Sequence, residues 1–187
     1  WAAAGDYQTI GDFGDIDDTR YKEGIYVGYR YFDTANVKPL YPFGYGLSYT
    51  DFAIAVTEVS NAKNIITVKA TVTNTGAYIG REVVQLYVAC PDGNIDKPYQ
   101  TLVAFAKTKI LKPGEKQTLS LTFDMKDCAS YAEESASFIL EKGNYIIRAG
   151  NSSVNTGLVA VVNLTTDIIT EKVKNALGKP DFADAVL

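Results

Sequence analysis

The sequence predicts an all-β fold, an antiparallel β-sandwich, on three observations. Apolar and polar residues alternate from about residue 53 onward, which is the period-two pattern of strands with one buried face. Turn-forming residues separate the alternating runs. No helical spacing of apolar residues comes between these runs, so the connections suit an antiparallel two-sheet sandwich better than a parallel α/β sheet.

About eight short strands are expected, because that many runs have strand-like patterning. The clearest run is 66–73, where apolar residues alternate with Thr and Lys. The expected strands are 52–59, 66–73, 82–90, 101–111, 119–123, 137–140, 145–149 and 158–164. The core candidates on their inward faces are Val68, Val72, Leu86, Leu121, Phe123 and Ile147.

Turn signals occupy the gaps between the expected strands. Each contains Gly, Pro, Asn, Asp or Ser, residues that favour tight turns. The expected turns are 74–76, 91–94, 112–115, 141–144 and 150–152. We therefore expect the sandwich to occupy residues 53–165.

The two ends of the chain lack the strand pattern. Residues 1–22 are rich in Gly and Asp and are expected to form a loop. Its aspartates between positions 12 and 18 suggest a calcium loop, but the glycine and the distal bidentate Glu of such a loop are missing. We interpret them as a solvated loop and predict no metal site. Residues 166–187 are expected to form a short helix and a tail or linker, because apolar residues recur at helical spacing before Gly178-Lys179-Pro180.

Composition excludes several functional classes. The chain has 187 residues, a net charge of −4 and dispersed Lys and Arg, so it has no electrostatic footprint for nucleic acid or an anionic membrane. No apolar run reaches the roughly 18 residues that a membrane span needs. The sequence contains no histidine, which excludes a Ser-His-Asp or Cys-His nucleophile system and any His-containing metal site. No cofactor is predicted.

The two cysteines are predicted to be free thiols. Cys90 ends one expected strand and Cys128 lies in a distant loop, and nothing in the pattern pairs them. Free thiols, with no signal-peptide pattern, favour a cytoplasmic location. Because the first residue is Trp1 and not Met, however, we expect the chain to be a fragment, and its location stays undetermined.

Residues 23–52 are expected to form a strand followed by a connector. The connector is rich in glycine and aromatic residues. Glycines permit close backbone approach or positive φ, and the rings supply a large contact area. So many aromatic side chains in a linker need a surface to pack on.

Two blocks in this region resemble the junction between the α/β sandwich domain and the fibronectin type III-like domain of family-three glycoside hydrolases of the β-glucosidase type. They are 23–33, EGIYVGYRYFD, and 42–49, PFGYGLSY. The resemblance continues through 72–76, 82–88, 111–115 and 143–145. The motif residues that we assign to a structural junction are Glu23, Gly24, Gly28, Tyr29, Arg30, Tyr31, Asp33, Pro42, Phe43, Gly44, Gly46, Leu47, Ser48 and Tyr49.

The resemblance implies a division of the chain into three parts. Residues 1–52 are the end of an α/β domain and the connector, 53–165 are an immunoglobulin-like, fibronectin type III-like sandwich, and 166–187 are a helix and tail. The parent's partners for this chain are then its catalytic barrel and α/β sandwich domains. The charged tail favours a permuted order in which the barrel follows the sandwich, although the usual order places the sandwich last.

The resemblance also implies a retaining β-glucosidase or related β-glycosidase as the parent. Such an enzyme uses two carboxyl groups roughly 5 Å apart. In the family these belong to the barrel and to an earlier part of the α/β domain, so this chain is predicted to have no catalytic residue and to be inactive alone. Glu23, Asp33 and Asp51 are interpreted as structural carboxylates.

Two alternatives remain open. Arg30, between Tyr29 and Tyr31, forms a junction ion pair or helps to shape a sugar site, and Trp1 and Tyr7 are candidates for contact with a β-glucoside or oligosaccharide substrate. The chain could also be an independent carbohydrate-binding or adhesion module, because sandwiches of this type serve many tasks. The aromatic connector favours the enzyme piece, since a free-standing module has no use for it.

Overall fold

The computed structural model describes residues 17, 21–176, 178 and 183. Three antiparallel sheets make up nearly all of its regular structure. The first has the order β1-β2-β5, the second β4-β3-β8-β9 and the third β10-β7-β6. Their strands are β1 (Phe52–Ala62), β2 (Ile65–Asn74), β3 (Val83–Ala89), β4 (Thr101–Lys107), β5 (Lys116–Asp124), β6 (Ser130–Ala132), β7 (Ser137–Leu140), β8 (Gly143–Gly150), β9 (Thr156–Leu164) and β10 (Ile168–Lys172).

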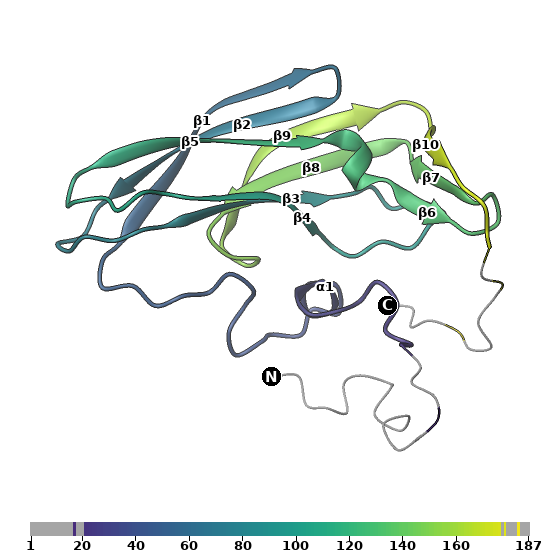
Figure 1. The fold of residues 1–187 in the computed structure, drawn as a ribbon, viewed down its shortest axis with the longest axis horizontal. Coiled ribbons are helices and arrows are strands. Elements are labelled where there is room, and N and C mark those ends of the chain that lie inside the picture. The colour runs from purple at the N-terminus through teal and green to yellow at the C-terminus, as the bar shows by residue number, and fades with distance from the viewer. Residues whose placement is uncertain (1–16, 18–20, 177, 179–182, 184–187) are drawn as a thin grey trace.

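The first two sheets form the sandwich, and the third lies at one end of it (Figure 1). A single turn of 3₁₀ helix, η3 (Met125–Cys128), leads from β5 to the third sheet. The α-helix α1 (Tyr29–Thr34) lies beside the sandwich on the side of the connector (Figure 1). The prediction of an antiparallel β-sandwich is confirmed.

The core lies between the two large sheets. In β2 every second side chain from Ile66 to Asn74 is buried, and in β5 the buried positions are Leu119, Leu121 and Phe123. All six predicted core residues are buried, and the most exposed of them, Phe123, has only 4% of its surface exposed. Strict alternation in β2 therefore identified the inward face correctly, because a one-residue slip would turn every side chain outward.

Strand β3 departs from alternation because it is covered on both faces. Val84, Leu86 and Val88 face the core, yet Gln85 and Tyr87 on the other face are also buried. Tyr29, in the chain segment before β1, packs on Tyr87 of this outer face, and Phe43 packs on Tyr29. The connector and the sandwich therefore share one packed interior.

Two local expectations were wrong. The strand expected at the start of 23–52 is replaced by turns and by α1, which begins after Gly28 at φ 61°, a backbone conformation that breaks an extended run. The helix expected within 166–187 is not formed over the described residues 167–176, which are β10 and irregular chain: Ile168 pairs with Leu140 and Ile169 with Ile139. Pairing with β7 overrides the helical spacing, since β-branched residues suit a strand.

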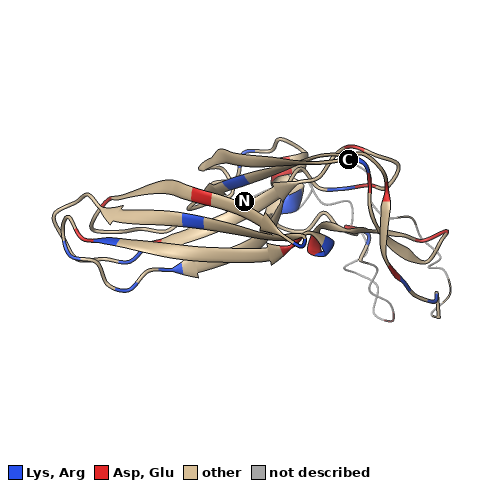
Figure 2. Ribbon diagram, turned by 90° about the horizontal axis from the view of Figure 1, so that it is seen from above, with Lys and Arg blue, Asp and Glu red and all other residues tan. Residues whose placement is uncertain are grey.

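Charged residues of both signs are spread over the described strands and loops (Figure 2). No helix in the described part of the chain is long and apolar enough to cross a bilayer. Within these same residues no group of three or more Cys, Asp or Glu side chains is arranged to hold a metal ion.

Candidate functional site

The candidate functional site is the junction where α1 and the connector meet the outer face of β3. Tyr29 stands at its centre. Its ring centroid lies 4.9 Å from that of Phe43 and 5.8 Å from that of Tyr87, the latter in an edge-on arrangement. Its hydroxyl oxygen accepts a hydrogen bond from the backbone N–H of Leu102 at 2.8 Å. One side chain of α1 therefore contacts both β3 and β4.

Gly44 allows the connector to lie directly on Gln85. Its φ is +86°, and a Cβ built there would stand 2.3 Å from Nε2 of Gln85. Gln85 has little freedom to move, because its amide donates to the carbonyl of Asn151 at 2.9 Å and accepts from the hydroxyl of Tyr87. Only glycine satisfies both the backbone angle and the space at this point.

Helix α1 and the turn before it bind the loop between β3 and β4 through side chains. The amide of Gln100 donates to the Asp33 carboxylate at 2.8 Å, and the N–H of Tyr99 donates to the Thr34 hydroxyl at 2.9 Å. The hydroxyl of Tyr26 donates to the carboxylate of Asp96 at 2.5 Å. These contacts join residues about 65 to 70 positions apart. They therefore bind α1 and the preceding turn to the sandwich.

A cavity of about 670 Å³ opens beside this contact. Asp33, Tyr99, Gln100, Arg148 and Ser153 are among its lining residues. The guanidinium carbon of Arg148 lies 5.9 Å from the centroid of the Tyr99 ring. Burial raises the pKa of Asp33 above its ordinary value, and the hydrogen bond from Gln100 opposes that rise. An arginine, a carboxylate and an aromatic ring are groups that a sugar could contact.

Three polar atoms at this cavity are poorly placed to serve a ligand. Gln100 Oε1, Arg148 Nε and Ser153 Oγ are enclosed by neighbouring atoms and have no hydrogen-bond partner within the described residues. A ligand would reach them only after side chains moved. The cavity is therefore less well prepared for a polar ligand than its lining residues suggest, because preorganised sites present their polar groups to the ligand.

The predicted motif residues are brought together only in part. Tyr29, Asp33, Phe43 and Gly44 meet β3 and its neighbours, whereas Leu47 and Tyr49 are 92% and 94% exposed. The remaining motif residues, Gly24, Gly28, Pro42, Gly46 and Ser48, are half-buried or exposed.

Arg30 is half-buried, and within the described residues it has no ion-pair partner. Both alternatives for Arg30, a junction ion pair and a contribution to a sugar site, therefore stay predictions. Tyr31 packs edge-on against Phe32 with 5.6 Å between ring centroids. Trp1 and Tyr7 lie outside the described residues.

The three carboxylates interpreted as structural have different surroundings. Asp33 accepts the bond from Gln100. Glu23 and Asp51 contribute backbone carbonyls, the first to the N–H of Tyr26 at 2.9 Å and the second to the N–H of Thr75 at 2.8 Å. The carboxylate of Asp33 is the one that lines the large cavity.

Sequence reasoning missed a second organised carboxylate, Glu141. Its side chain accepts from the N–H of Asn94 at 2.7 Å, from the N–H of Ile95 at 3.3 Å and from the ammonium of Lys97. The side chains of Lys97 and Glu141 are only 8% and 6% exposed. In the sequence Glu141 stands in an apparent turn, Glu-Lys-Gly-Asn, so only the long-range contact distinguishes it from a surface residue.

Comparison with known proteins places these features in a larger context. Residues 82–153 match the family model described as a fibronectin type III-like domain. β-Glucosidase A of Butyrivibrio fibrisolvens is 45% identical over 145 residues, which cover 67% of this chain and 18% of that protein. The matched part of the chain spans only 13% to 18% of the length of the curated β-glucosidases that it matches.

Solved structures agree with the sequence matches. The β-glucosidase of Paenibacillus barengoltzii superposes with a TM-score of 0.86 and 40% identity, over 92% of this chain and 20% of that one. The GH3 β-glucosidase of Bifidobacterium adolescentis does so with a TM-score of 0.77 and 36% identity, over 86% of this chain and 24% of that one. Both matches extend beyond residues 82–153, so the likeness includes more than that segment of the sandwich.

Proposed function

We propose, from the premise that this chain matches the fibronectin type III-like region of family-three β-glucosidases, that it is the non-catalytic packing module of such an enzyme. The parent would hydrolyse terminal β-D-glucosyl residues, using carboxylates that lie outside residues 1–187. This chain would hold the junction between the parent's domains in a fixed geometry. We also propose the division into 1–52, 53–165 and 166–187.

The observation that carries the proposal is the burial of the outer face of β3. Gln85 and Tyr87 are 5% and 0% exposed. Tyr29 packs on Tyr87, Phe43 packs on Tyr29, and Gly44 lies against Gln85. A connector that only tethered two domains would have no reason to bury a tyrosine and a glutamine on a sheet. A connector that sets the direction in which the chain enters the sandwich would.

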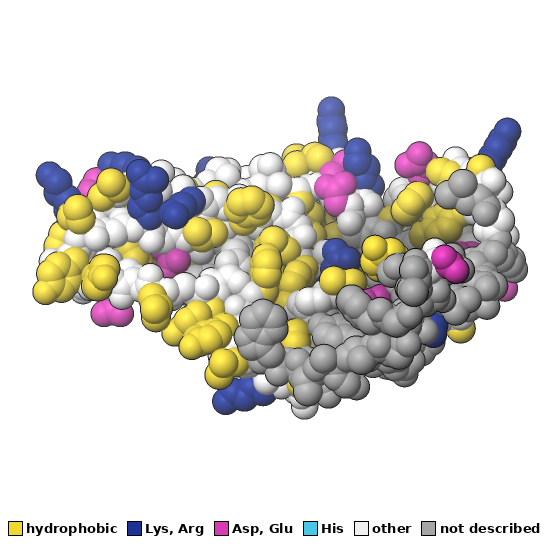
Figure 3. Space-filling view, turned by 60° about the horizontal axis from the view of Figure 1, so that its bottom comes forward, with side chains coloured by type: hydrophobic (Ala, Val, Ile, Leu, Met, Phe, Trp, Pro, Cys, Tyr) yellow, Lys and Arg dark blue, Asp and Glu magenta, His cyan; other side chains and the backbone are white. Residues whose placement is uncertain are grey.

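The exposed part of the connector is a candidate surface for the parent's barrel or α/β domain. Figure 3, which brings this side forward, shows hydrophobic side chains spread over the face. The exposed large apolar residues of the connector are Leu40, Tyr41, Phe43, Tyr45, Leu47 and Tyr49, with exposed fractions from 48% to 94%. Six large apolar side chains exposed within residues 40–49 support a contact of this segment with another part of the protein.

The described carboxylates support a non-catalytic role. Glu141 is occupied by three donors, and no second carboxylate perturbs the pKa of Asp33 among the described residues. A retaining glycosidase needs two carboxyl groups close enough to work on one bond. The single carboxylate of the large cavity does not meet that requirement.

The test is to incubate the purified chain with aryl β-glucoside and aryl β-xyloside, beside a buffer blank and a mock purification from the same host. We expect no release above these controls. Turnover that co-purifies with the chain and disappears in Asp33→Asn would overturn the proposal.

A second experiment uses the parent enzyme with Arg30→Ala. Lower thermal stability with unchanged kcat/KM supports the junction role, whereas a selective rise in KM would mean that Arg30 lines the sugar site. Titration of the chain with glucose and cellobiose by calorimetry separates the packing module from a carbohydrate-binding module. Saturable heat that is lost in Arg148→Ala would favour the binding module.

A further inference from the structure

The two cysteines, distant in sequence, meet at the end of the sandwich that carries the third sheet. Cys90 directly follows β3, and Cys128 is the last residue of η3. The Cys90 thiol lies 3.7 Å from the backbone carbonyl oxygen of Cys128 and donates to it. Both are free in this structure, as the sequence predicted.

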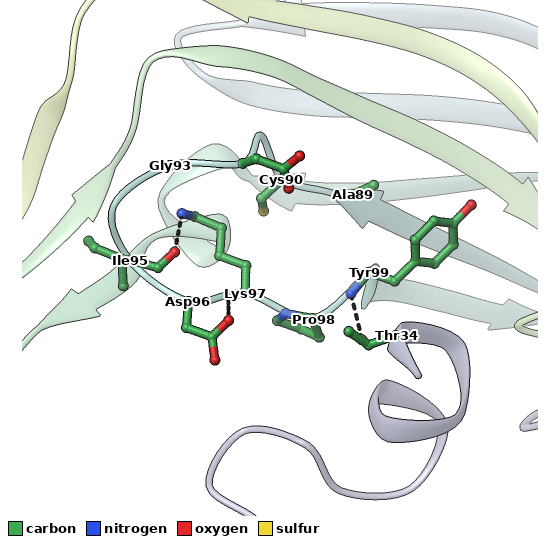
Figure 4. Close-up of a pocket in the computed structure, with 10 residues that line it drawn as sticks. Thr34, Ala89, Cys90, Gly93, Ile95, Asp96, Lys97, Pro98 and Tyr99 are labelled. Carbon is green, nitrogen blue, oxygen red and sulfur yellow. Dashed lines mark hydrogen bonds between the residues drawn. The ribbon is translucent and has the colours of Figure 1, made fainter. Parts of the chain in front are cut away.

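The two thiols differ in their access to solvent. Cys128 is 8% exposed and is part of the hydrophobic core. Cys90 is half-buried and lines a cavity of about 430 Å³ together with Asp92, Gly93, Lys97 and Tyr99. Figure 4 shows the wall of this cavity, with Cys90 and Lys97 on opposite limbs of the loop between β3 and β4. A small oxidant can therefore reach Cys90 before it reaches Cys128.

The surroundings also favour the thiolate of Cys90. The hydrogen bond with the Cys128 thiol lowers the pKa of Cys90, burial opposes this, and the positive charge of Lys97 lowers it further. The pKa of Cys128 is raised, chiefly by the same hydrogen bond and by burial. Thiolate character and access together decide which cysteine is oxidised first.

We propose that Cys90 is a site of oxidation by small hydroperoxides and that Cys128 resolves it to an intramolecular disulfide. The Cys90 thiolate attacks the terminal peroxide oxygen; an S–O bond forms, the O–O bond breaks, and the alcohol or water leaves with a proton. The Cys128 sulfur then attacks the Cys90 sulfur, the S–O bond breaks, and hydroxide leaves as water with the Cys128 proton. Two thiols lose two electrons in total, and the hydroperoxide gains them.

The fold allows this step because both cysteines lie outside regular strands. Cys90 stands where β3 has ended, and the residue after Cys128, Ala129, is already in extended backbone. A disulfide needs α-carbons about 4.4–6.8 Å apart, and the 3.7 Å between the Cys90 thiol and the Cys128 carbonyl oxygen makes the two residues direct neighbours. The bridge would tie the end of β3 to the segment that leads into the third sheet.

The test treats the full chain with a small molar excess of hydrogen peroxide, then alkylates it with N-ethylmaleimide in denaturant and measures the intact mass. We expect both alkylations to be lost, the mass to fall by a pair of hydrogens, and a peptide map to link Cys90 with Cys128. The melting temperature should rise by on the order of 5 °C, since the bridge closes a loop of intermediate length. A chain that still takes up two alkyl groups, or that forms only intermolecular dimers, would overturn the proposal.

Two variants assign the roles. In Cys128→Ser, peroxide should leave Cys90 as a sulfenic acid that dimedone captures. In Cys90→Ser, Cys128 should remain fully alkylated after the same treatment; oxidation of Cys128 at an unchanged rate in this variant would contradict the assignment of Cys90 as the attacking thiol. Circular dichroism checks that both variants are folded, and if either is not, the peptide map of the unmodified sequence decides alone.

Discussion

Replacing Glu141 by Gln should lower the free energy of unfolding by about 3 kcal/mol, at the lower end of the range for breaking one partner of a buried ion pair. The substitution keeps the shape of the side chain and removes its charge. Lys97, whose side chain is 8% exposed, would be left without its counter-ion. The amide of Gln would also turn its NH₂ group toward at least one of the three donors that now meet the carboxylate, the N–H groups of Asn94 and Ile95 and the Lys97 ammonium.

Urea unfolding, monitored by circular dichroism, measures this loss in the free energy of unfolding. With a slope of about 2 kcal/mol per molar urea, the midpoint should fall by roughly 1.5 M. The melting temperature should fall by about 6–12 °C. The matched control is Glu58→Gln, which breaks the exposed pair of Glu58 with Lys69, whose side chains are 53% and 43% exposed. Exposed pairs contribute about 0–1 kcal/mol, so this midpoint should hardly move.

A double-mutant cycle shows whether charge is the cause. Lys97→Met combined with Glu141→Gln should be more stable than Glu141→Gln alone, because the uncompensated ammonium is gone. Equal midpoints for Glu141→Gln and Glu58→Gln, or strictly additive losses in the cycle, would refute the reasoning.

The other predictions concern the effect of low pH on stability and substitutions at two positions, one in the junction and one in the core. Burial raises the pKa of Glu141, but the hydrogen bonds from Lys97, Asn94 and Ile95 and the lysine charge outweigh it and lower the pKa below its ordinary value of 4.5. The stability that the carboxylate contributes is therefore present above about pH 4.5 and is lost as the pH falls through the folded-state pKa. The urea midpoint should fall more steeply with acid in the unmodified chain than in Glu141→Gln. Gly44→Ala should lower the free energy of unfolding by about 1–3 kcal/mol, because of the positive φ and the displaced Gln85 amide. In the control Gly46→Ala a Cβ meets nothing within 4 Å, so the loss should be under about 0.5 kcal/mol. Urea midpoints measure both losses, and equal values would contradict the role of Gly44. Asn74→Ala should cost about 2–4 kcal/mol, because the fully buried amide donates to the carbonyl oxygens of Tyr78 and Leu111; a loss no larger than that of an exposed substitution would contradict it.

The sandwich could be predicted because its strands carry the evidence locally. In β2 the pleat alone decides which side chains are buried, so the order of apolar and Thr or Lys residues from 66 to 73 reveals the inward face. The outer face of β3 could not be predicted in this way. Gln85 and Tyr87 read as solvent-facing residues of a half-buried strand, and only the connector, which precedes them by about 40 residues, makes them buried.

The missed elements share a physical cause. The β6 strand has three residues and β10 has five, too few for a period to be established, and both exist because β7 lies between them. Glu141 likewise depends on donors that lie 44 to 47 positions away along the chain. Patterns within a window of ten residues describe faces of elements, and they carry no information on partners brought by the fold.

The loop between β3 and β4 joins the features that the sequence did not connect. Its first residue, Cys90, faces Cys128; its middle is held by Glu141; and its end binds the α1 segment through Asp96, Tyr99 and Gln100. The loop has no regular structure of its own, so its shape depends on these anchors at both ends. Loss of the Glu141 anchor should therefore loosen the contacts with α1 as well as the core. Amide hydrogen exchange in Glu141→Gln should then be faster at Tyr99 and Leu102, whose N–H groups donate hydrogen bonds to the hydroxyls of Thr34 and Tyr29. The N–H groups that pair β2 with β5 should exchange only as fast as the global loss of stability requires.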